Sequence, residues 1–413
     1  MNNSNLISRL KSTASINLVR HLCQLLIGIS VARLLSVDDK GLHFVFTTFA
    51  AAGGILLSFG MANSIVYHVK RELISIKTFY RLTFLTIVMI SVICVVAAFF
   101  LYPIFSDIFF RGKDHQSYFF SVFILLVVIS FNNYLLSSLS LALSLKGLYF
   151  FQMVIGSLIF LALLLIGLTF LKFDIYDVIY GFVAIEGIVG VICLCFVGFK
   201  LRDCRKNVGG STKPVEVLKY AGSCYLGVSG STIAANGDSL IASSMLDSYQ
   251  MGLYSIAKTF YRLIAIIPQT INSVAFGYFC EKEFNDSVLI VKKICLIFTS
   301  LSSIMVICSY FVLEDAIKIL YGEKFIGAFM PALILVFSAA LMGCTSAIKP
   351  FFLAYNRPFT ASLVVVISNS IGLILCSYLI LYYGLAGAAL SSLIVAVLAT
   401  ILRLYFFTRF KSE

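Results

Sequence analysis

The sequence predicts an all-α polytopic membrane protein with about twelve transmembrane helices in two parallel six-helix bundles. Of its 413 residues, 60% are hydrophobic and only 12% are charged, and the mean hydropathy is +1.01. The apolar runs are about 20 to 25 residues long, the length that a helix needs to cross about 30 Å of hydrocarbon. A motif in the first half of the chain also recurs in the second half.

Hydropathy places the predicted spans at regular intervals along the chain. They occupy residues 15–35, 42–67, 82–104, 117–143, 149–171, 177–199, 221–246, 252–279, 289–313, 328–354, 359–382 and 385–407. The first and the seventh are the richest in small and polar residues. The polar start of the chain is not followed by a small-residue cleavage site, so we expect no removable signal peptide.

Basic residues gather in alternate connections between the spans. Two such connections are 70–81 and 200–219, and one side of the predicted topology carries about 20 cationic residues against about 7 on the other. This bias predicts that both termini are cytoplasmic. We therefore interpret the net charge of +12 mainly as a topology signal, with some attraction to anionic membrane lipids, and expect no nucleic acid partner.

The recurring motif reads ARLLSVDDKGLHFVFTTF at residues 32–49 and SSMLDSYQMGLYSIAKTF at residues 243–260. Gly41 aligns with Gly252 when the two copies are superimposed. Because six spans per copy is an even number, both copies enter the membrane from the same side and are parallel repeats.

Three segments follow from this repeat. We expect an N-terminal six-helix bundle at 1–200, a basic cytoplasmic linker at 201–220 and a C-terminal six-helix bundle at 221–413. Paired bundles of this kind place a substrate site at the interface of the repeats.

The two copies differ in charge. Thr47 and Ala51 of the first copy align with Lys258 and Arg262 of the second. These cations are four residues apart on one helical face, about 9 and 15 Å below the outer end. A charge at such depth costs about 2.5–3.5 kcal/mol, so we expect both side chains to line a cavity and bind substrate. The alternative is a pair of interhelical anchors.

Asp238 is the candidate partner of Lys258. It lies at a similar depth in the seventh span, within the small and polar segment from Gly222 to Ser239. An ion pair between Asp238 and Lys258 would either be structural or be broken by substrate or by a proton.

Further ionisable residues lie within the first and sixth spans. Arg20 and Arg33 could extend a cationic path for the substrate, although Arg33 could instead reach the membrane interface. His21 could titrate in the physiological range or serve as a packed polar residue. Glu186 is the only acid deep in the sixth span, where it would bind a coupling ion or pair with a base.

Small residues and a proline mark candidate hinges. Pro268 should kink the eighth span, and Gly53 and Gly54 could loosen the second, although small residues also permit close helix packing. The sequence has no GxxxxGK[ST] phosphate loop, no HExxH metal site and no GxSxG elbow. We therefore expect no catalytic residues, no metal and no cofactor.

Several stretches carry a family resemblance. LLSVDDKGLHFVFTTF and LSFGMANSIVYHV resemble the start of polysaccharide-transporter flippases, which belong to the multidrug/oligosaccharidyl-lipid/polysaccharide exporter superfamily. NGDSLIASSMLDSYQMGLYSIAKTFYRLIAIIPQTI is similar to the seventh and eighth helices of this family, and YYGLAGAALSSLIVAVLATILRLYFF to its final helix.

The resemblance implies a function in O-antigen or capsule assembly, as in lipopolysaccharide biosynthesis. Such flippases move an undecaprenyl-diphosphate-linked oligosaccharide across the bacterial inner membrane by alternating access coupled to an ion gradient, with protons or sodium as candidate ions. Other glycan-assembly membrane proteins are candidate partners. The alternatives are a multidrug antiporter of the same superfamily, a membrane glycan polymerase or ligase, and a non-transporting scaffold.

Overall fold

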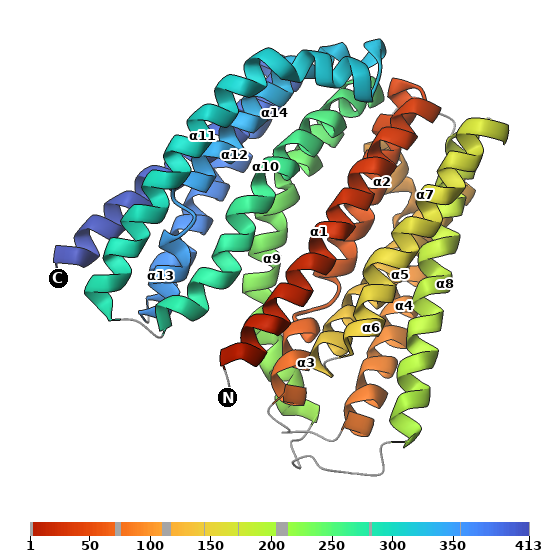
Figure 1. Ribbon diagram of the computed structural model, residues 1–413. Helices are drawn as coiled ribbons and strands as arrows, with labels where there is room; N and C mark the ends of the chain where they lie inside the picture. Colours follow the sequence, from red (N-terminus) through yellow and green to blue (C-terminus); the bar gives the residue numbers. More distant parts are fainter. Residues whose placement is uncertain are drawn as a thin grey trace. The chain divides into compact units, whose positions relative to one another are not determined.

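The described chain consists of helices joined by short turns (Figure 1). The computed structural model describes residues 3–70, 76–109, 117–143, 145–171, 173–203, 214–280, 283–355 and 357–412, and no strand occurs within these ranges. The first elements are α1 (Asn3–Leu34), α2 (Val37–Leu56), α3 (Met61–Lys70), α4 (Ile76–Phe109), α5 (Ser117–Ala142), α6 (Lys146–Phe150), the π-helix η1 (Phe151–Ile155), α7 (Gly156–Ile166), the π-helix η2 (Gly167–Leu171) and α8 (Ile175–Asp203). The later elements are α9 (Pro214–Met245), α10 (Ser248–Cys280), α11 (Phe284–Leu320), the 3-10 helix η3 (Glu323–Ala328), α12 (Phe329–Cys344), α13 (Ile348–Ala354) and α14 (Pro358–Ser412).

Six helical stretches in the described part of the chain are long and apolar enough to cross a membrane. They are Phe120–Ala142, Gly147–Leu171, Ile175–Phe199, Phe284–Leu320, Glu323–Ala354 and Phe359–Phe410. The bent pair of α2 and α3 would make a seventh. The prediction of an all-α polytopic membrane protein is thus confirmed.

Every predicted span falls on a helix or on consecutive helices. The long stretch Phe359–Phe410 contains the last two predicted spans. The spans predicted at 15–35, 221–246 and 252–279 fall on α1, α9 and α10, which are not among these long apolar stretches. The span predicted at 82–104 falls on α4, where the apolar stretch found is the shorter Tyr80–Cys94. Helices α1, α9 and α10 contain most of the ionisable residues singled out in the sequence.

Two helices break at glycines with positive φ. The axis bends by 51° between α2 and α3, and Gly60 in the connecting turn has a φ of +76°. Within α14, Gly384 has φ 52° and ψ −130°, in the gap between the two predicted spans. Glycine lacks a Cβ atom and adopts this backbone conformation without the usual steric cost.

Contacts between Cα atoms divide the chain into two compact units. Unit 1 comprises Met1–Leu10, Leu35–Phe44 and Gly237–Glu413, and unit 2 comprises Lys11–Leu34 and Val45–Asn236. The division at the 201–220 linker stays a prediction, and residues 204–213 of that linker lie outside the described ranges.

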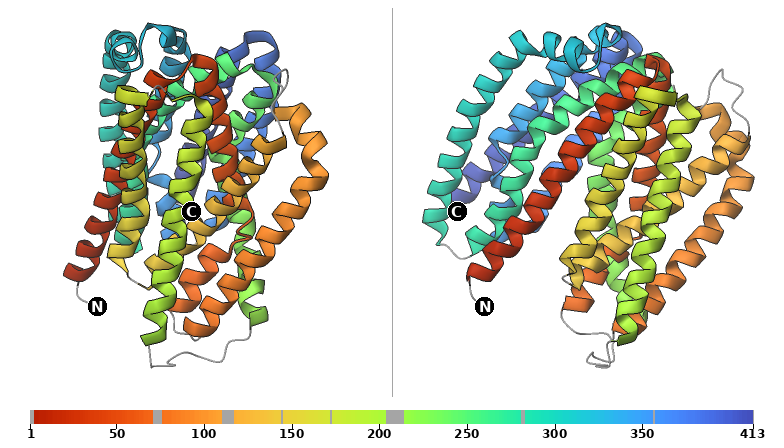
Figure 2. Two further views of the ribbon diagram at one scale, coloured as in Figure 1. Left: turned by 90° about the vertical axis from the view of Figure 1, so that its right-hand side faces the viewer. Right: turned by 45° about the vertical axis from the view of Figure 1, so that its right-hand side comes forward.

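Unit 2 has a core of apolar side chains from α3, α5 and α8. Ile65, Phe131, Leu135 and Cys193 are completely buried in it. Figure 2 shows α4, α5 and α8 running beside one another. Close packing of such side chains provides many small dispersion contacts, which hold helices together where lipid replaces water.

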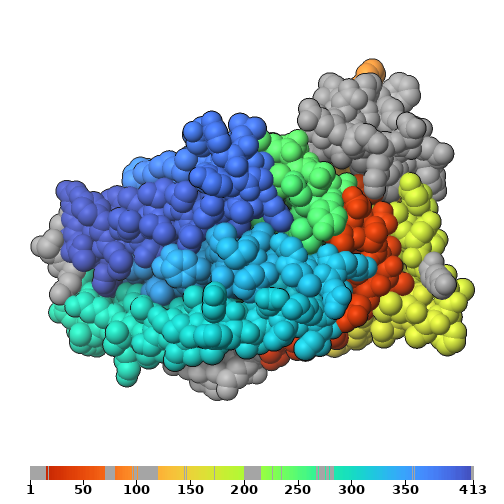
Figure 3. Space-filling model, turned by 90° about the horizontal axis from the view of Figure 1, so that it is seen from above, coloured from red at the N-terminus to blue at the C-terminus, as the bar shows by residue number. Residues whose placement is uncertain are grey.

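Unit 1 has an aromatic core at one end of α10 and α14. Phe279, Phe351, Phe352 and Phe407 are buried there, and the rings of Phe351 and Phe407 meet edge to face at 5.3 Å. Figure 3 shows α11, α12 and α14 side by side on the face seen from above. These contacts hold α10 against the helices that follow it.

The repeated glycines mark a close backbone contact between the first turns of α2 and α10. A Cβ atom added at Gly41 would lie 1.8 Å from the carbonyl oxygen of Ser248, and one added at Gly252 would lie 2.1 Å from that of Val37. The alignment that superimposes Gly41 on Gly252 also superimposes Val37 on Ser248. The contact is therefore reciprocal, as expected for two copies related by a twofold axis.

Candidate functional site

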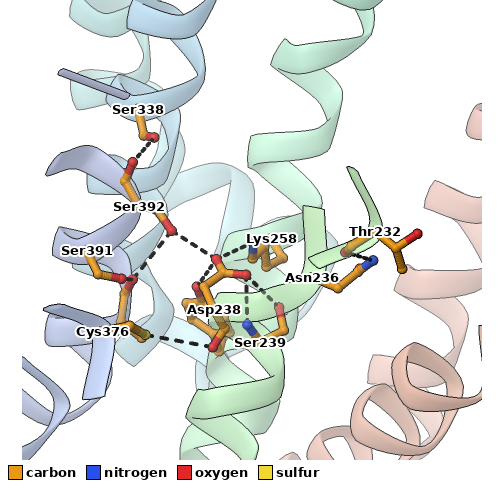
Figure 4. A network of polar contacts seen from close by, with 11 residues as sticks. Thr232, Asn236, Asp238, Ser239, Lys258, Ser338, Cys376, Ser391 and Ser392 are labelled. Atoms are coloured by element: carbon orange, nitrogen blue, oxygen red, sulfur yellow. Dashed lines mark hydrogen bonds and ion pairs between the residues drawn. The ribbon is translucent and has the colours of Figure 1, made fainter. Parts of the chain in front are cut away.

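An ion pair between α9 and α10 forms the centre of the site in unit 1 (Figure 4). The Lys258 Nζ atom lies 2.5 Å from Asp238 Oδ2, and both side chains are largely buried, with 7% and 14% of their surface exposed. The hydroxyls of Tyr254 and Ser392 donate to the same oxygen at 2.8 and 2.9 Å. The backbone N–H of Ser239 donates to Oδ1 at 2.7 Å. The structure thus brings Asp238 and Lys258 together and supplies hydrogen bonds to both oxygens of the carboxylate.

One face of α10 presents the site. Tyr254, Lys258 and Arg262 follow one another at intervals of four residues, which places them on the same side of a helix. The Lys258 ammonium also lies over the rings of Tyr254 and Tyr261, at 5.7 and 5.2 Å from their centroids. Cation–π contacts of this kind contribute about 0.5–2 kcal/mol each. Lys258 is therefore held in place, and its charge is balanced by Asp238.

Arg262 differs from Lys258 in making no ion pair with any of the described residues. Its side chain is exposed, and no carboxylate lies within ion-pair distance of it among the described residues. Lys40 in the first turn of α2 is 7% exposed and lies near enough for its charge and that of Arg262 to repel each other. The charge of Asp238 also acts on Arg262, but Asp238 is already paired with Lys258. Lys40 and Arg262 therefore leave an excess of positive charge, which favours an anion.

Two more cations of unit 1 lie near Arg262 along the chain's fold, since the charges of Arg403 and Arg262 both act on Tyr261. Arg403 of α14 donates a hydrogen bond to the Thr345 hydroxyl at 3.2 Å, and its charge acts on Lys349 of α13. The region defined by Lys40, Arg262, Lys349 and Arg403 is called the cationic cluster below.

Several residues of this site were not singled out in the sequence. The sequence could have indicated Tyr254 as a site residue, because it precedes Lys258 by one helical turn. Lys349 and Arg403 are charges inside predicted apolar spans, which is also a signal. Nothing in the sequence indicated Ser392, because a serine within an apolar helix is common and its contact with Asp238 spans 154 residues.

Unit 2 contains a second polar cluster, around Glu186 in α8. Asn133 of α5 donates through Nδ2 to Glu186 Oε2 at 2.8 Å and to the Glu186 carbonyl oxygen at 3.3 Å. Gln152 donates through Nε2 to the Asn133 carbonyl oxygen at 2.7 Å. Gln152 lies in the π-helix η1, a type of helical irregularity that is frequent at functional sites.

The Asn133 and Gln152 amides donate hydrogen bonds, but the oxygens of these amides accept none within the described residues. Asn132 Oδ1, Asn133 Oδ1 and Gln152 Oε1 are buried and have no hydrogen-bond partner within the described part of the chain. Each such oxygen costs about 1–3 kcal/mol unless it finds a donor or a cation. The cluster around Glu186 is therefore rich in oxygens suited to a proton or an alkali cation.

The remaining predicted cations belong to unit 2. The positive charge of Arg20 acts on the Glu186 carboxylate, and the Arg20 and His21 side chains are half-buried, whereas Arg33 is exposed. Lys258 and Arg262 belong to unit 1. A continuous cationic path through all of these residues stays a prediction.

The candidate hinge residues have close neighbours. Pro268 lies inside α10, and a Cβ atom added at Gly343 of α12 would lie 3.1 Å from its Cγ. A Cβ atom at Gly54 would lie 2.6 Å from the Phe131 backbone nitrogen, so Gly54 permits close packing of α2 on α5. Gly53 has more room, since the nearest atom, of Val127, would be 3.4 Å away. The hinge role of all three stays a prediction.

The fold places the chain in a known class of polytopic membrane proteins. The lipid II flippase MurJ in an inward closed conformation is similar with a TM-score of 0.73 at 11% identity, over 95% of this chain and 86% of that one. An inward-facing multidrug resistance MATE family transporter of the MOP superfamily is similar with a TM-score of 0.68 at 14% identity, over 95% and 96%. A mutant of the Vibrio cholerae MATE transporter VcmN is similar with a TM-score of 0.64 at 14% identity, over 99% and 98%.

The family follows from the sequence itself. Residues 30–330 match the family model described as polysaccharide biosynthesis protein. Because the match covers most of the chain, the chain belongs to this family of membrane proteins. Among curated proteins, none matches the chain.

Proposed function

We propose that this chain is a flippase that carries undecaprenyl-diphosphate-linked O-antigen or capsule oligosaccharides across the bacterial inner membrane by alternating access. Membership of the polysaccharide biosynthesis family and a fold similar to that of a lipid II flippase support this assignment. Both termini would lie in the cytoplasm, and other glycan-assembly membrane proteins would supply and consume the substrate.

The observation that carries the proposal is the excess of positive charge in unit 1. Asp238 balances Lys258, while Arg262 has no carboxylate within ion-pair distance in the described ranges and Lys40 lies close enough to repel it. Moving an unpaired anion into an apolar medium costs tens of kcal/mol by Born estimates, on the order of 20 or more. A guanidinium that can hold phosphate oxygens through two parallel hydrogen bonds offsets part of this cost for a diphosphate.

Ion coupling would use the Glu186 cluster of unit 2. The Glu186 carboxylate accepts a hydrogen bond from Asn133, and three buried amide oxygens of the cluster have no donor in the described chain. An oxygen-rich environment of this kind suits a proton or a sodium ion. The Asp238–Lys258 pair would be a second charge switch if substrate or a proton breaks it.

Replacing Arg262 with alanine is expected to abolish glycan export while the protein still inserts into the membrane. Arg262 is exposed, so its removal leaves no cavity in the core, but it removes charge-assisted hydrogen bonds worth about 1.5–3 kcal/mol. Affinity for undecaprenyl diphosphate should therefore fall about 10- to 100-fold. The measurements are surface glycan in cells that depend on the variant and lipid binding by the purified protein.

Two outcomes would redirect the assignment. Normal glycan export by Arg262→Ala would remove Arg262 from the mechanism. Transport of organic cations by reconstituted protein, without any change in the sidedness of the lipid-linked oligosaccharide, would favour a multidrug antiporter. Formation of longer glycans by the purified protein would favour a polymerase or ligase.

Replacing Glu186 with glutamine is expected to uncouple transport from the ion gradient. The glutamine oxygen can accept the Asn133 hydrogen bond, so the fold is kept, but the ionisable group is lost. One unit of pH difference supplies about 1.4 kcal/mol per proton, a factor of about ten in the final distribution of substrate. In proteoliposomes that contain the wild type, the distribution of substrate across the membrane should shift by about this factor under a proton or an equivalent sodium gradient. With the variant, the distribution of substrate should not shift.

Glu314→Gln is the matched control, because Glu314 forms an exposed ion pair with Lys318. The control should respond to the gradient as the wild type does. A Glu186→Gln protein that still concentrates substrate under the gradient would exclude Glu186 as the coupling residue.

A further inference from the structure

Unit 2 contains an open cavity of about 630 Å³ whose lining has no aspartate, glutamate, lysine, arginine or histidine. Ile55 of α2, Asn63 of α3 and Tyr134 of α5 form one side. The other side is a face of α9, formed by Ser223, Cys224, Gly227, Val228, Ser231, Thr232, Ala235 and Asn236. A diphosphate would find no cation there, so the cavity suits a different part of a substrate.

The polar groups of α9 are arranged mainly as acceptors. The hydroxyls of Ser223, Ser231 and Thr232 donate to carbonyl oxygens one turn earlier in the helix, at 2.7, 2.9 and 2.9 Å. Asn236 donates through Nδ2 to the Thr232 carbonyl oxygen at 3.2 Å. Each hydroxyl thus keeps lone pairs that can accept a hydrogen bond from a ligand.

The opposite side of the cavity offers unused donors. The Asn63 amide and the Tyr134 hydroxyl make no side-chain hydrogen bond within the described part of the chain. These groups come from α3 and α5, so they face the α9 acceptors from separate helices. A ligand rich in hydroxyl groups both donates and accepts hydrogen bonds and would satisfy both sides.

The cavity also has a suitable size. A volume of about 630 Å³ lies within the range of about 300–1,000 Å³ that is usual for small-molecule sites. It corresponds to the space of about twenty water molecules at about 30 Å³ each. One or two sugar rings fit into such a space.

We propose that this cavity is a carbohydrate subsite that holds neutral sugar rings of a lipid-linked oligosaccharide. The proposal rests on the function proposed above and concerns only the sugar end of the substrate. The lining of this cavity lies entirely within unit 2. Uncharged hydroxyl and amide groups, together with one tyrosine, discriminate sugars from both phosphate and hydrocarbon.

Gly227 provides a way to fill the cavity without disturbing the fold. A Cβ atom added at Gly227 would meet no other atom within 4 Å, and the same holds for Gly230 of the same helix. Gly227 lines the cavity, whereas Gly230 does not. Gly227→Leu therefore occupies the sugar space, and Gly230→Leu is a matched control with the same gain in helix propensity.

The test compares the binding of two lipids to the purified full-length protein. One probe is undecaprenyl diphosphate, and the other is undecaprenyl diphosphate that carries a neutral disaccharide of a hexose and an N-acetylhexosamine. Two or three hydrogen bonds at about 0.5–1.5 kcal/mol each should make the wild type bind the glycosylated lipid about tenfold more tightly. Gly227→Leu should erase this difference, Gly230→Leu should keep it, and Tyr134→Phe should reduce it.

The two proposals fail in distinguishable ways. Equal binding of both lipids by the wild type, or a preference for the glycosylated lipid that survives in Gly227→Leu, would overturn the carbohydrate subsite. Loss of affinity for bare undecaprenyl diphosphate in Gly227→Leu would identify the cavity as a lipid-tail or headgroup site instead, which also overturns it. Failure of the wild type to bind either lipid would overturn the proposed function itself.

Discussion

Lys258→Met is expected to destabilise the folded protein by about 3–5 kcal/mol, because it leaves the Asp238 carboxylate buried without a counterion. Asp238→Asn should have an effect of similar size, since it leaves the Lys258 ammonium without its partner at 2.5 Å. The double variant Asp238→Asn/Lys258→Met should recover most of the loss, because no uncompensated charge remains. Thermal unfolding of the detergent-purified proteins measures this double-mutant cycle.

Lys318→Met provides the control for this cycle. Lys318 pairs with Glu314 at 2.7 Å, but 38% and 46% of the two side chains are exposed. Exposed pairs contribute about 0–1 kcal/mol, so this variant should unfold close to the wild-type temperature. Single variants of the buried pair that are no less stable than Lys318→Met would contradict the electrostatic account.

Transport by the double variant then separates the two roles left open for the pair. A stable double variant that transports normally would make the pair a structural element. A stable double variant without transport would show that the charges themselves are used, either by the substrate or by a proton. The hydroxyls of Tyr254 and Ser392 stay beside the site in both cases. A loss of transport would therefore not be explained by altered packing alone.

The contact between Asp238 and Lys258 could be predicted from the sequence because a short turn joins their helices. α9 ends at Met245 and α10 begins at Ser248. Residues at similar distances from such a turn lie at a similar depth, which a rise of about 1.5 Å per residue is enough to estimate. The all-α membrane class was equally accessible, because hydrocarbon thickness sets the length of an apolar run.

Other features depend on contacts that sequence spacing does not constrain. Lys40 lies in the charged segment before the second predicted span. In the structure α2 already begins at Val37, so Lys40 is part of this helix, and its side chain is buried. The break between α2 and α3 falls at Gly60, whereas the sequence drew attention to Gly53 and Gly54. Asn133 becomes a partner of Glu186 only through the packing of α5 on α8. Tertiary contacts decide which of many polar residues in apolar helices meet.

Gly41→Ala is expected to force apart the first turns of α2 and α10. Alanine normally stabilises a helix by about 1 kcal/mol relative to glycine. Here the new Cβ atom would lie 1.8 Å from the Ser248 carbonyl oxygen, and a backbone atom cannot rotate away as a side chain does. The same reasoning applies to Gly252→Ala, whose Cβ atom would lie 2.1 Å from the Val37 carbonyl oxygen. Gly28→Ala in α1 is the control, because a Cβ atom there meets nothing within 4 Å.

Spin labels at Asp38 and Tyr249, which are both exposed, report the separation of the two turns in a chain whose native cysteines are replaced. The distance between the labels should increase in Gly41→Ala and in Gly252→Ala and should not change in Gly28→Ala. In the alternating-access cycle proposed above, this contact would form again after it opens, so both variants should also lose transport. An unchanged distance in Gly41→Ala, together with normal transport, would show that the reciprocal glycine contact is not required in the cycle, and the recurrence of the motif would then reflect the common origin of the two copies alone.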